Sequence, residues 1–317
     1  MINRIFFLFV ILILSSGLLV QAQTPGAAIN HYEHGAKRFQ IGNLDGAIED
    51  FTKAIEISSR LGSDRPARGQ FLPGADGLAA PDAEAAGITV IDPFTARAYT
   101  GRGLARYRKG DIEGAMADWN RAIRISPGLA EAYLDRGSGR YASGDTAGAV
   151  ADWNRAIQIN PRLSFAYSNR GAARQELGDV AGALADLNEA IRLDLRDATP
   201  YCHRGFVWLE KLDFDRAIAD FNKALEFNPR MAQAYLGRGD ARICRLDLET
   251  AIADFGHALE LDPNLANAYL NRGLALLLQG KETEAEKDFE RCRALKMGDD
   301  LERRINLARR LVATTKH

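Results

Sequence analysis

Two histidines, His31 and His34, are the first candidates for chemistry, because they flank Glu33 at a spacing of three residues on an expected helix. That spacing could present two imidazoles to a metal ion, but no third ligand is evident nearby. The other histidines are isolated in the sequence. The chain also has no nucleophile elbow, phosphate-binding glycine loop or Cys-His pair in a cleft-forming context. The sequence therefore predicts no catalytic residue, no metal site and no cofactor, so we expect a protein that is not an enzyme.

The cysteines are Cys202, Cys244 and Cys292, an odd set without paired spacing. They do not support a structural disulfide framework. Cys292 stands where the pattern described below has alanine, so we expect it to be a small buried side chain. Cys202 is expected on the partner-facing side of a first helix, where its thiol could be accessible.

Arginine and aspartate recur with fixed spacing. Four times, two arginines four residues apart are followed by an aspartate 12 residues after the second arginine. These sets are Arg102, Arg106 and Asp118; Arg136, Arg140 and Asp152; Arg170, Arg174 and Asp186; and Arg238, Arg242 and Asp254. One interpretation is an internal ladder of ion pairs that fixes how neighbouring segments register. In the other interpretation the second arginine of each pair is left over, and the spare arginines form a strip for an acidic partner or a polyanionic glycan.

Glycine, alanine and aromatic residues define the elements that must position these charges. The glycines share one frame of 34 residues: Gly35, Gly103, Gly137, Gly171, Gly205, Gly239 and Gly273. An alanine follows each of them after 12 residues, and a bulky apolar residue follows after four more, as Trp119 and Trp153 illustrate. A glycine on one helix that faces alanine on the next allows a close approach, and the large side chain fills the wider end. Each repeat therefore predicts two short antiparallel helices.

Tyrosine precedes the glycine by four residues in six repeats, as Tyr99, Tyr133, Tyr167, Tyr201, Tyr235 and Tyr269. With these tyrosines the pattern resembles the tetratricopeptide repeat family. The resemblance implies an all-α, right-handed superhelical solenoid of antiparallel helix pairs, with a first repeat at 28–61 and six contiguous repeats at 96–299. A Gly/Pro-rich insertion at 62–95 separates them; a lid, a decayed repeat and disorder all remain open for it. Residues 300–317 are expected to form a capping helix and tail.

Proteins of this family commonly hold an extended peptide or a helix in their concave surface, through positions 2, 5, 9, 12 and 13 of the first helix of each repeat. Here these positions vary between repeats while the packing positions do not. The resemblance thus implies partner-binding residues at Arg97, Thr100, Leu104, Tyr107, Arg108, Glu131, Leu134, Tyr141, Phe165 and Gln175. In the last repeat the same positions carry Asn267, Leu270, Leu274, Leu277 and Leu278, which we expect the capping helix to cover in part.

The N-terminal segment 1–22 has one basic residue, an uncharged apolar run and small residues at Val20 and Ala22, which is typical of a signal peptide cut after Ala22. An uncleaved anchor is the alternative, and it would be the only source of membrane contact. With 41 basic and 42 acidic residues the chain is nearly neutral, so nucleic-acid binding is not expected.

We therefore expect an exported, periplasmic or extracellular scaffold or adaptor that binds another protein without catalysis. The alternatives are an architectural, self-assembling envelope protein and a polyanion- or peptidoglycan-binding module. The oligomeric state is left open by the sequence.

Overall fold

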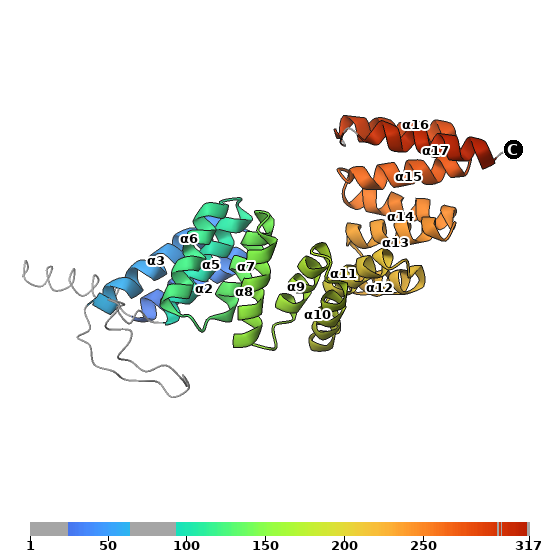
Figure 1. The fold of residues 1–317 in the computed structure, drawn as a ribbon. Helices are drawn as coiled ribbons and strands as arrows, with labels where there is room; N and C mark the ends of the chain where they lie inside the picture. The colour runs from blue at the N-terminus through green and yellow to red at the C-terminus, as the bar shows by residue number, and fades with distance from the viewer. Residues whose placement is uncertain (1–24, 64–92, 297, 299, 316–317) are drawn as a thin grey trace, which may run out of the picture. The chain divides into compact units, whose positions relative to one another are not determined.

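The computed structural model describes residues 25–63, 93–296, 298 and 300–315 (Figure 1). Within these ranges the structure has 15 helices and no strand, which confirms the predicted all-α repeat fold. The chain divides into two compact bodies, which we call the N-terminal body, ending at Pro161, and the C-terminal body, beginning at Arg162. Each body is described by itself.

The N-terminal body contains three helix pairs. They are α2 (Pro25–Gln40) with α3 (Leu44–Ser63), α5 (Pro93–Arg108) with α6 (Ile112–Ile125), and α7 (Ala130–Ala142) with α8 (Thr146–Ile159). The two helices of a pair pack on each other, and the second helix also contacts the first helix of the next pair. Two expected boundaries shift, because α3 continues to Ser63, past the end predicted at 61, and α5 begins at Pro93, before the start predicted at 96.

The C-terminal body contains four helix pairs and a final helix. They are α9 (Ser164–Glu176) with α10 (Val180–Leu193), α11 (Ala198–Glu210) with α12 (Phe214–Phe227), α13 (Ala232–Cys244) with α14 (Leu248–Leu261), α15 (Ala266–Leu278) with α16 (Glu282–Ala294), and α17 (Leu301–Thr315). Successive first helices also contact each other directly, α9 with α11, α11 with α13 and α13 with α15. They therefore present one continuous surface within this body.

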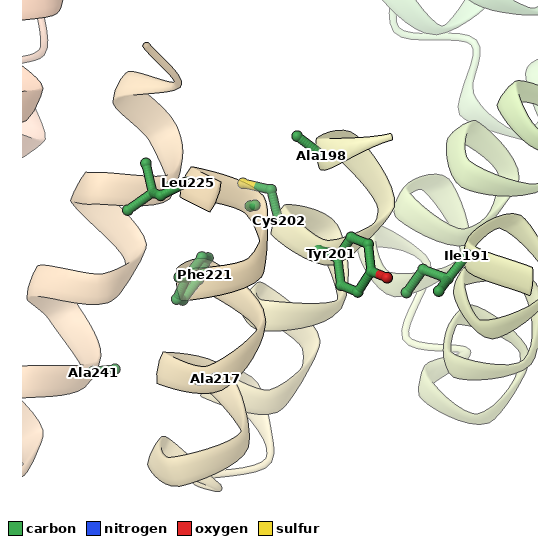
Figure 2. Packing of buried hydrophobic residues seen from close by; sticks show 10 residues of the cluster. Ile191, Ala198, Tyr201, Cys202, Ala217, Phe221, Leu225 and Ala241 are labelled. Atoms are coloured by element: carbon green, nitrogen blue, oxygen red, sulfur yellow. The ribbon is translucent and has the colours of Figure 1, made fainter. Parts of the chain in front are cut away.

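Bulky side chains fix the helix pairs at a distance that only glycine tolerates. A β-carbon added at Gly103 would lie 2.6 Å from Nε1 of Trp119. In the C-terminal body, Phe221 is fully buried between two glycines, and added β-carbons at Gly205 and Gly237 would lie 2.7 and 2.3 Å from its ring. Figure 2 shows this ring within its cluster of buried side chains. The frame glycine Gly205 thus sets the spacing within this repeat, and Gly237 allows the same ring to approach the next repeat closely.

The turn between the helices of a pair needs a left-handed residue. Five repeats place glycine there, for example Gly178 at φ +80°. Two repeats instead have Leu212 and Leu246, which adopt the same conformation at φ 58° and 61° and remain 72% and 76% exposed. A leucine in this region carries strain that glycine does not. The two leucines change only the turn, since helices α11 to α14 have the same lengths as α9 and α10.

Helix α17 covers the last apolar surface, as expected of a capping helix. Its Leu301 and Ile305 are buried in a cluster that includes Leu270 and Leu277. Leu278 is not covered, and it remains 44% exposed. The expectation for the groove leucines of the last repeat therefore agrees with the packing.

The predicted signal peptide at 1–22 and most of the insertion at 62–95 lie outside the described residues. Among the helices that are described, none is both long and apolar enough to span a membrane.

Candidate functional site

Each repeat buries one aspartate on its second helix, and in six repeats an arginine on the first helix binds it through two parallel bonds. Asp118 is 3% exposed, and its oxygens accept hydrogen bonds from Nε and Nη2 of Arg102 at 2.9 and 2.7 Å. This planar arrangement is the strong form of an arginine-carboxylate pair. The same two bonds join Arg136 to Asp152, Arg170 to Asp186, Arg204 to Asp220, Arg238 to Asp254 and Arg272 to Asp288.

The second arginine of each pair binds the same aspartate. Nη1 of Arg106 donates to Asp118 at 2.8 Å, and its Nε lies 3.7 Å from Asp111, the residue that caps α6. Equivalent contacts at 3.0, 2.9 and 2.6 Å join Arg140 to Asp152, Arg174 to Asp186 and Arg242 to Asp254, the first of them an ion pair. The interpretation that these arginines are left over is therefore wrong. They are half-buried parts of the internal ladder and do not form a free basic strip.

The first arginine also reaches the preceding repeat. Nη1 of Arg136 donates to Oδ1 of Asn120 at 2.7 Å, and Nη1 of Arg102 donates to Oγ1 of Thr52 at 3.1 Å. In the C-terminal body, Arg204 and Arg238 bind Asn188 and Asn222 in the same way, both at 2.6 Å. One guanidinium thus joins two helices of its own repeat to the second helix of the repeat before it. This is direct support for the predicted role in registering neighbours, and the repeated asparagine is a sequence signal of the bond that the spacing of the charges alone does not reveal.

Three repeats depart from this scheme and show what it tolerates. Asp50 contacts Nδ1 of His31 at 3.2 Å and Nη1 of Arg38 at 3.0 Å. Asp220 accepts from Nε1 of Trp208 at 3.0 Å, where other repeats use a second arginine. Asp288 keeps its two bonds from Arg272, but Leu276 stands where four repeats have the second arginine. His31 therefore has a structural contact, and within the described residues no group of three metal-ligating side chains comes together.

We use the term first-helix face for the surface formed by positions 2, 5, 6, 9, 12 and 13 of successive first helices. Side chains on this face touch from one helix to the next. The guanidinium of Arg108 lies 4.3 Å from the ring centre of Phe39, and Nδ2 of Asn271 donates to Asp240 at 2.7 Å. Each body therefore has a continuous first-helix face, and it is the surface on which the predicted partner-binding residues lie.

Eight of the predicted partner-binding residues lie on α5 and α7 of the N-terminal body. Arg97, Arg108, Glu131 and Tyr141 are exposed, and Leu104, Tyr107 and Leu134 are half-buried. The tyrosines are backed by tryptophans, with ring centres 5.8 Å apart for Tyr107 and Trp119 and 5.9 Å for Tyr141 and Trp153. Thr100 is buried, and its hydroxyl donates to the carbonyl of Ala96, so it offers no free polar group to a partner.

The other two predicted residues, Phe165 and Gln175, lie on α9 of the C-terminal body. Phe165 is 56% exposed. Nε2 of Gln175 donates to Oε2 of Glu210 on α11 at 3.2 Å. The predicted set is thus divided between the two bodies, each of which has its own first-helix face.

Burial shifts the titration of several groups on these faces. It raises the pKa of Asp135 to about 7, and the nearby charge of Glu131 acts in the same direction. Burial also raises the pKa of Asp240 to about 6, although Asn271 and Arg304 both oppose that shift. The pKa of His203 is lowered by burial, although Oγ of Ser168 lies 3.3 Å from its Nδ1.

The solvent exposure of the cysteines agrees with the sequence analysis for Cys292 but not for Cys202. Cys202 is only 4% exposed, and burial raises the pKa of its thiol to about 12, so the expectation of an accessible thiol is wrong. Cys202 packs in the buried cluster around Phe221, which includes Ala234 and Ala241 of α13. Cys292 is fully buried, as expected, and Cys244 is the exposed one of the three.

Comparison with known proteins agrees with these repeats. A family described as TPR repeat matches residues 103–138 and 247–280, and two families described as tetratricopeptide repeat match 209–243 and 266–295. No curated protein sequence matches the chain.

Several solved structures share the fold at low identity. A tetratricopeptide repeat protein from Parabacteroides merdae is 18% identical, with a TM-score of 0.59 over 89% of this chain and 99% of that one. A chain of the APC/C hetero-tetramer Cut9-Hcn1 is 16% identical, with a TM-score of 0.64 over 86% of this chain and 54% of that one. Pseudomonas aeruginosa pilF is 18% identical, with a TM-score of 0.59 over 67% of this chain and 96% of that one. The segments at 103–138, 209–243 and 247–295 are therefore similar to tetratricopeptide repeats, and the described fold is shared with these solved structures.

Proposed function

We propose that this protein is a non-enzymatic interaction scaffold, and that the first-helix face of α5 and α7 binds an extended peptide or a helix of another protein. Tetratricopeptide repeats stack into surfaces that serve for protein-protein interaction. The observation that carries the proposal is the contrast between fixed and variable positions. The glycines, alanines and arginine-aspartate bonds repeat, whereas the exposed positions of the first helices differ from one repeat to the next.

The two tyrosines of this face suit a role as anchors. Tyr107 and Tyr141 each rest on a buried tryptophan, so they are held in place before a partner arrives. Aromatic side chains that are already ordered add contact area at a small entropic cost, and they are enriched in the centres of interfaces. Arg108, stacked on Phe39, adds a positioned cation beside them.

We further propose that the protein acts outside the cytoplasm, after cleavage following Ala22. The support is the sequence of residues 1–22 alone.

A photo-crosslinking amino acid at Tyr107 or Tyr141 tests the scaffold function in the native envelope. A matched control carries the same group at Ala151, which is exposed on the second helix α8. We expect one protein to crosslink from the two tyrosine positions and not from Ala151, and Tyr141→Ala to weaken that purified pair by about tenfold. Crosslinks only between copies of this chain would favour the self-assembling alternative. Salt-sensitive retention on peptidoglycan, lost with Arg97→Ala and Arg108→Ala, would favour the polyanion-binding alternative.

A further inference from the structure

The first-helix face of the C-terminal body has a one-sided charge. Its four first helices, α9, α11, α13 and α15, place three carboxylates on the face, Glu176, Glu210 and Asp240. No lysine or arginine occupies any of the face positions on these helices. In the N-terminal body, by contrast, α5 alone contributes Arg97 and Arg108 to the face. The near-neutral total charge of the chain therefore hides a local acidic surface.

The carboxylates border an apolar strip. Phe206 and Leu209 of α11 and Ile243 of α13 are half-buried on the same face. Their inner sides pack on the core, and the rings of Phe206 and Phe221 have centres 5.1 Å apart in an edge contact. Apolar side chains held in place this way, with carboxylates beside them, are complementary to a helix that has one apolar side and cationic flanks.

The chain's own last helix shows that this chemistry fits the end of the face. Helix α17 buries Leu301 and Ile305 against leucines of α15, while its four arginines, Arg303, Arg304, Arg309 and Arg310, are exposed. Arg304 is close enough to Asp240 to oppose the rise in the pKa of that carboxyl. A basic amphipathic helix is therefore already seated beside α15, with Arg304 near Asp240 of α13. The part of the face on α9 and α11 carries the same combination of apolar and acidic groups, and no described helix covers it in this way.

We propose that the first-helix face of the C-terminal body binds a basic amphipathic helix of another protein, with Phe206, Leu209 and Ile243 under its apolar side and Glu176, Glu210 and Asp240 beside its cations. This proposal depends on the proposed scaffold function in one respect only, which is that both use a first-helix face for binding. It lies in a different body from Tyr107 and Tyr141, so variants can test each surface separately.

A peptide that copies α17, with its three leucines, one glutamate and four arginines among the first eleven residues, is a suitable probe. The control peptide has glutamate in place of the four arginines. We expect the arginine peptide to bind the full-length protein at least about tenfold more tightly at low salt, and to lose much of that advantage at about 0.15 M salt, because exposed charges are then screened. Equal binding of both peptides, or no binding of the arginine peptide, would overturn the proposal.

Variants of the protein locate the site. Combining Glu176→Gln, Glu210→Gln and Asp240→Asn is expected to weaken binding of the arginine peptide by about tenfold or more, at an average of about twofold to threefold per carboxylate removed. The matched control removes three exposed carboxylates from the second helices α12 and α14 with Glu226→Gln, Glu249→Gln and Glu260→Gln. It has the same change in net charge and should bind within about twofold of the unmodified protein. If both triple variants lose affinity equally, the attraction is general and no site is present.

Cys244 provides an independent signal of position, because it is exposed on this face while the other two cysteines are buried. An environment-sensitive dye on Cys244 should respond to the arginine peptide with the same affinity as measured by anisotropy. Tight binding without a dye response would place the peptide elsewhere and refute the assignment. A concentration-dependent dimer of the protein that the triple variant abolishes would show that the occupant is a second copy's α17, and the proposal of a separate partner would be wrong.

Discussion

Gly256 in α14 leaves the inter-repeat bond of Arg272 unmade, and Gly256→Asn is expected to restore it. The equivalent positions in the two preceding repeats are Asn188 and Asn222, which accept from an arginine at 2.6 Å. Arg272 binds Asp288 as its counterparts do, and a β-carbon added at Gly256 would meet only its Nη1, at 3.9 Å. The new side chain therefore has room, and the donor is already aimed at it.

The expected gain has two sources. Replacing a glycine within a helix by alanine is worth about 1 kcal/mol, whereas asparagine recovers only about 0.3 kcal/mol of that. A hydrogen bond to the charged guanidinium adds about 1–2 kcal/mol. Gly256→Asn should thus stabilise the protein by about 1.3–2.3 kcal/mol, at least as much as Gly256→Ala, which reverses the order that helix propensity alone predicts.

Urea denaturation followed by circular dichroism measures the gain in the free energy of unfolding. Hydrogen exchange at α14 and α15 measures the same gain locally if the repeats do not unfold together. A double-mutant cycle with Arg272→Lys separates the hydrogen bond from propensity, because lysine has no planar fork to bind Asp288 and the introduced asparagine together. A coupling of about 1 kcal/mol is expected. If Gly256→Asn is less stable than Gly256→Ala by about 0.7 kcal/mol and the coupling is near zero, the asparagine contributes only helix propensity and makes no bond between repeats.

Other changes test separate parts of the structure. Asp254→Ala should lower the free energy of unfolding, measured by urea denaturation, by about 3–5 kcal/mol because it leaves Arg238 and Arg242 without their buried carboxylate. The control Glu249→Ala, on the exposed side of α14, should change it by no more than about 0.5 kcal/mol. Equal effects of the two substitutions would show that the ladder has no structural role. Leu212→Gly should raise the free energy of unfolding by about 1 kcal/mol by relieving the left-handed leucine, and an unchanged value would show that the turn is unstrained. For Asp240, burial raises the pKa in the folded state above its unfolded value, so the folded protein holds this proton more tightly and loses stability as pH rises through about 6. Asp240→Asn should therefore raise the melting temperature above pH 6 and change it little near pH 4, and equal shifts at both would contradict the assigned cause.

The sequence was sufficient for the helix pairs because their determinants are local and repeated. Gly103 and Trp119 lie in one repeat, and the contact between them follows from shape alone. The burial of Cys202 was not predicted, because it depends on how closely α9, α11 and α13 approach each other, and that distance is a property of the stack. Likewise, the bonds of Arg106 depend on side-chain reach across two helices, which spacing alone does not decide.

From the sequence, the partner-binding surface could be assigned to one side of the first helices, but the properties of its individual residues could not be predicted. The frame positions indicate which residues share it, and the described structure places them on the first helices as expected. The same positions did not reveal that Thr100 donates to its own helix or that the face is acidic in the C-terminal body. The first point depends on a rotamer, and the second emerges only when the residues are grouped by body.

The backward reach of the arginines gives the stack a direction. Arg238 joins its own Asp254 to Asn222 of the preceding repeat, and no equivalent bond from Asp254 runs forward to α15 within the described residues. Loss of Asp254 should therefore free the Arg238 side chain and weaken its bond to Asn222 of α12, whereas no ladder bond to α15 is lost. Each such joint is therefore asymmetric in its chemistry: the later repeat supplies the arginine donor and the earlier repeat supplies the acceptor, so a repeat placed first in the stack needs only the acceptor and one placed last needs only the arginine.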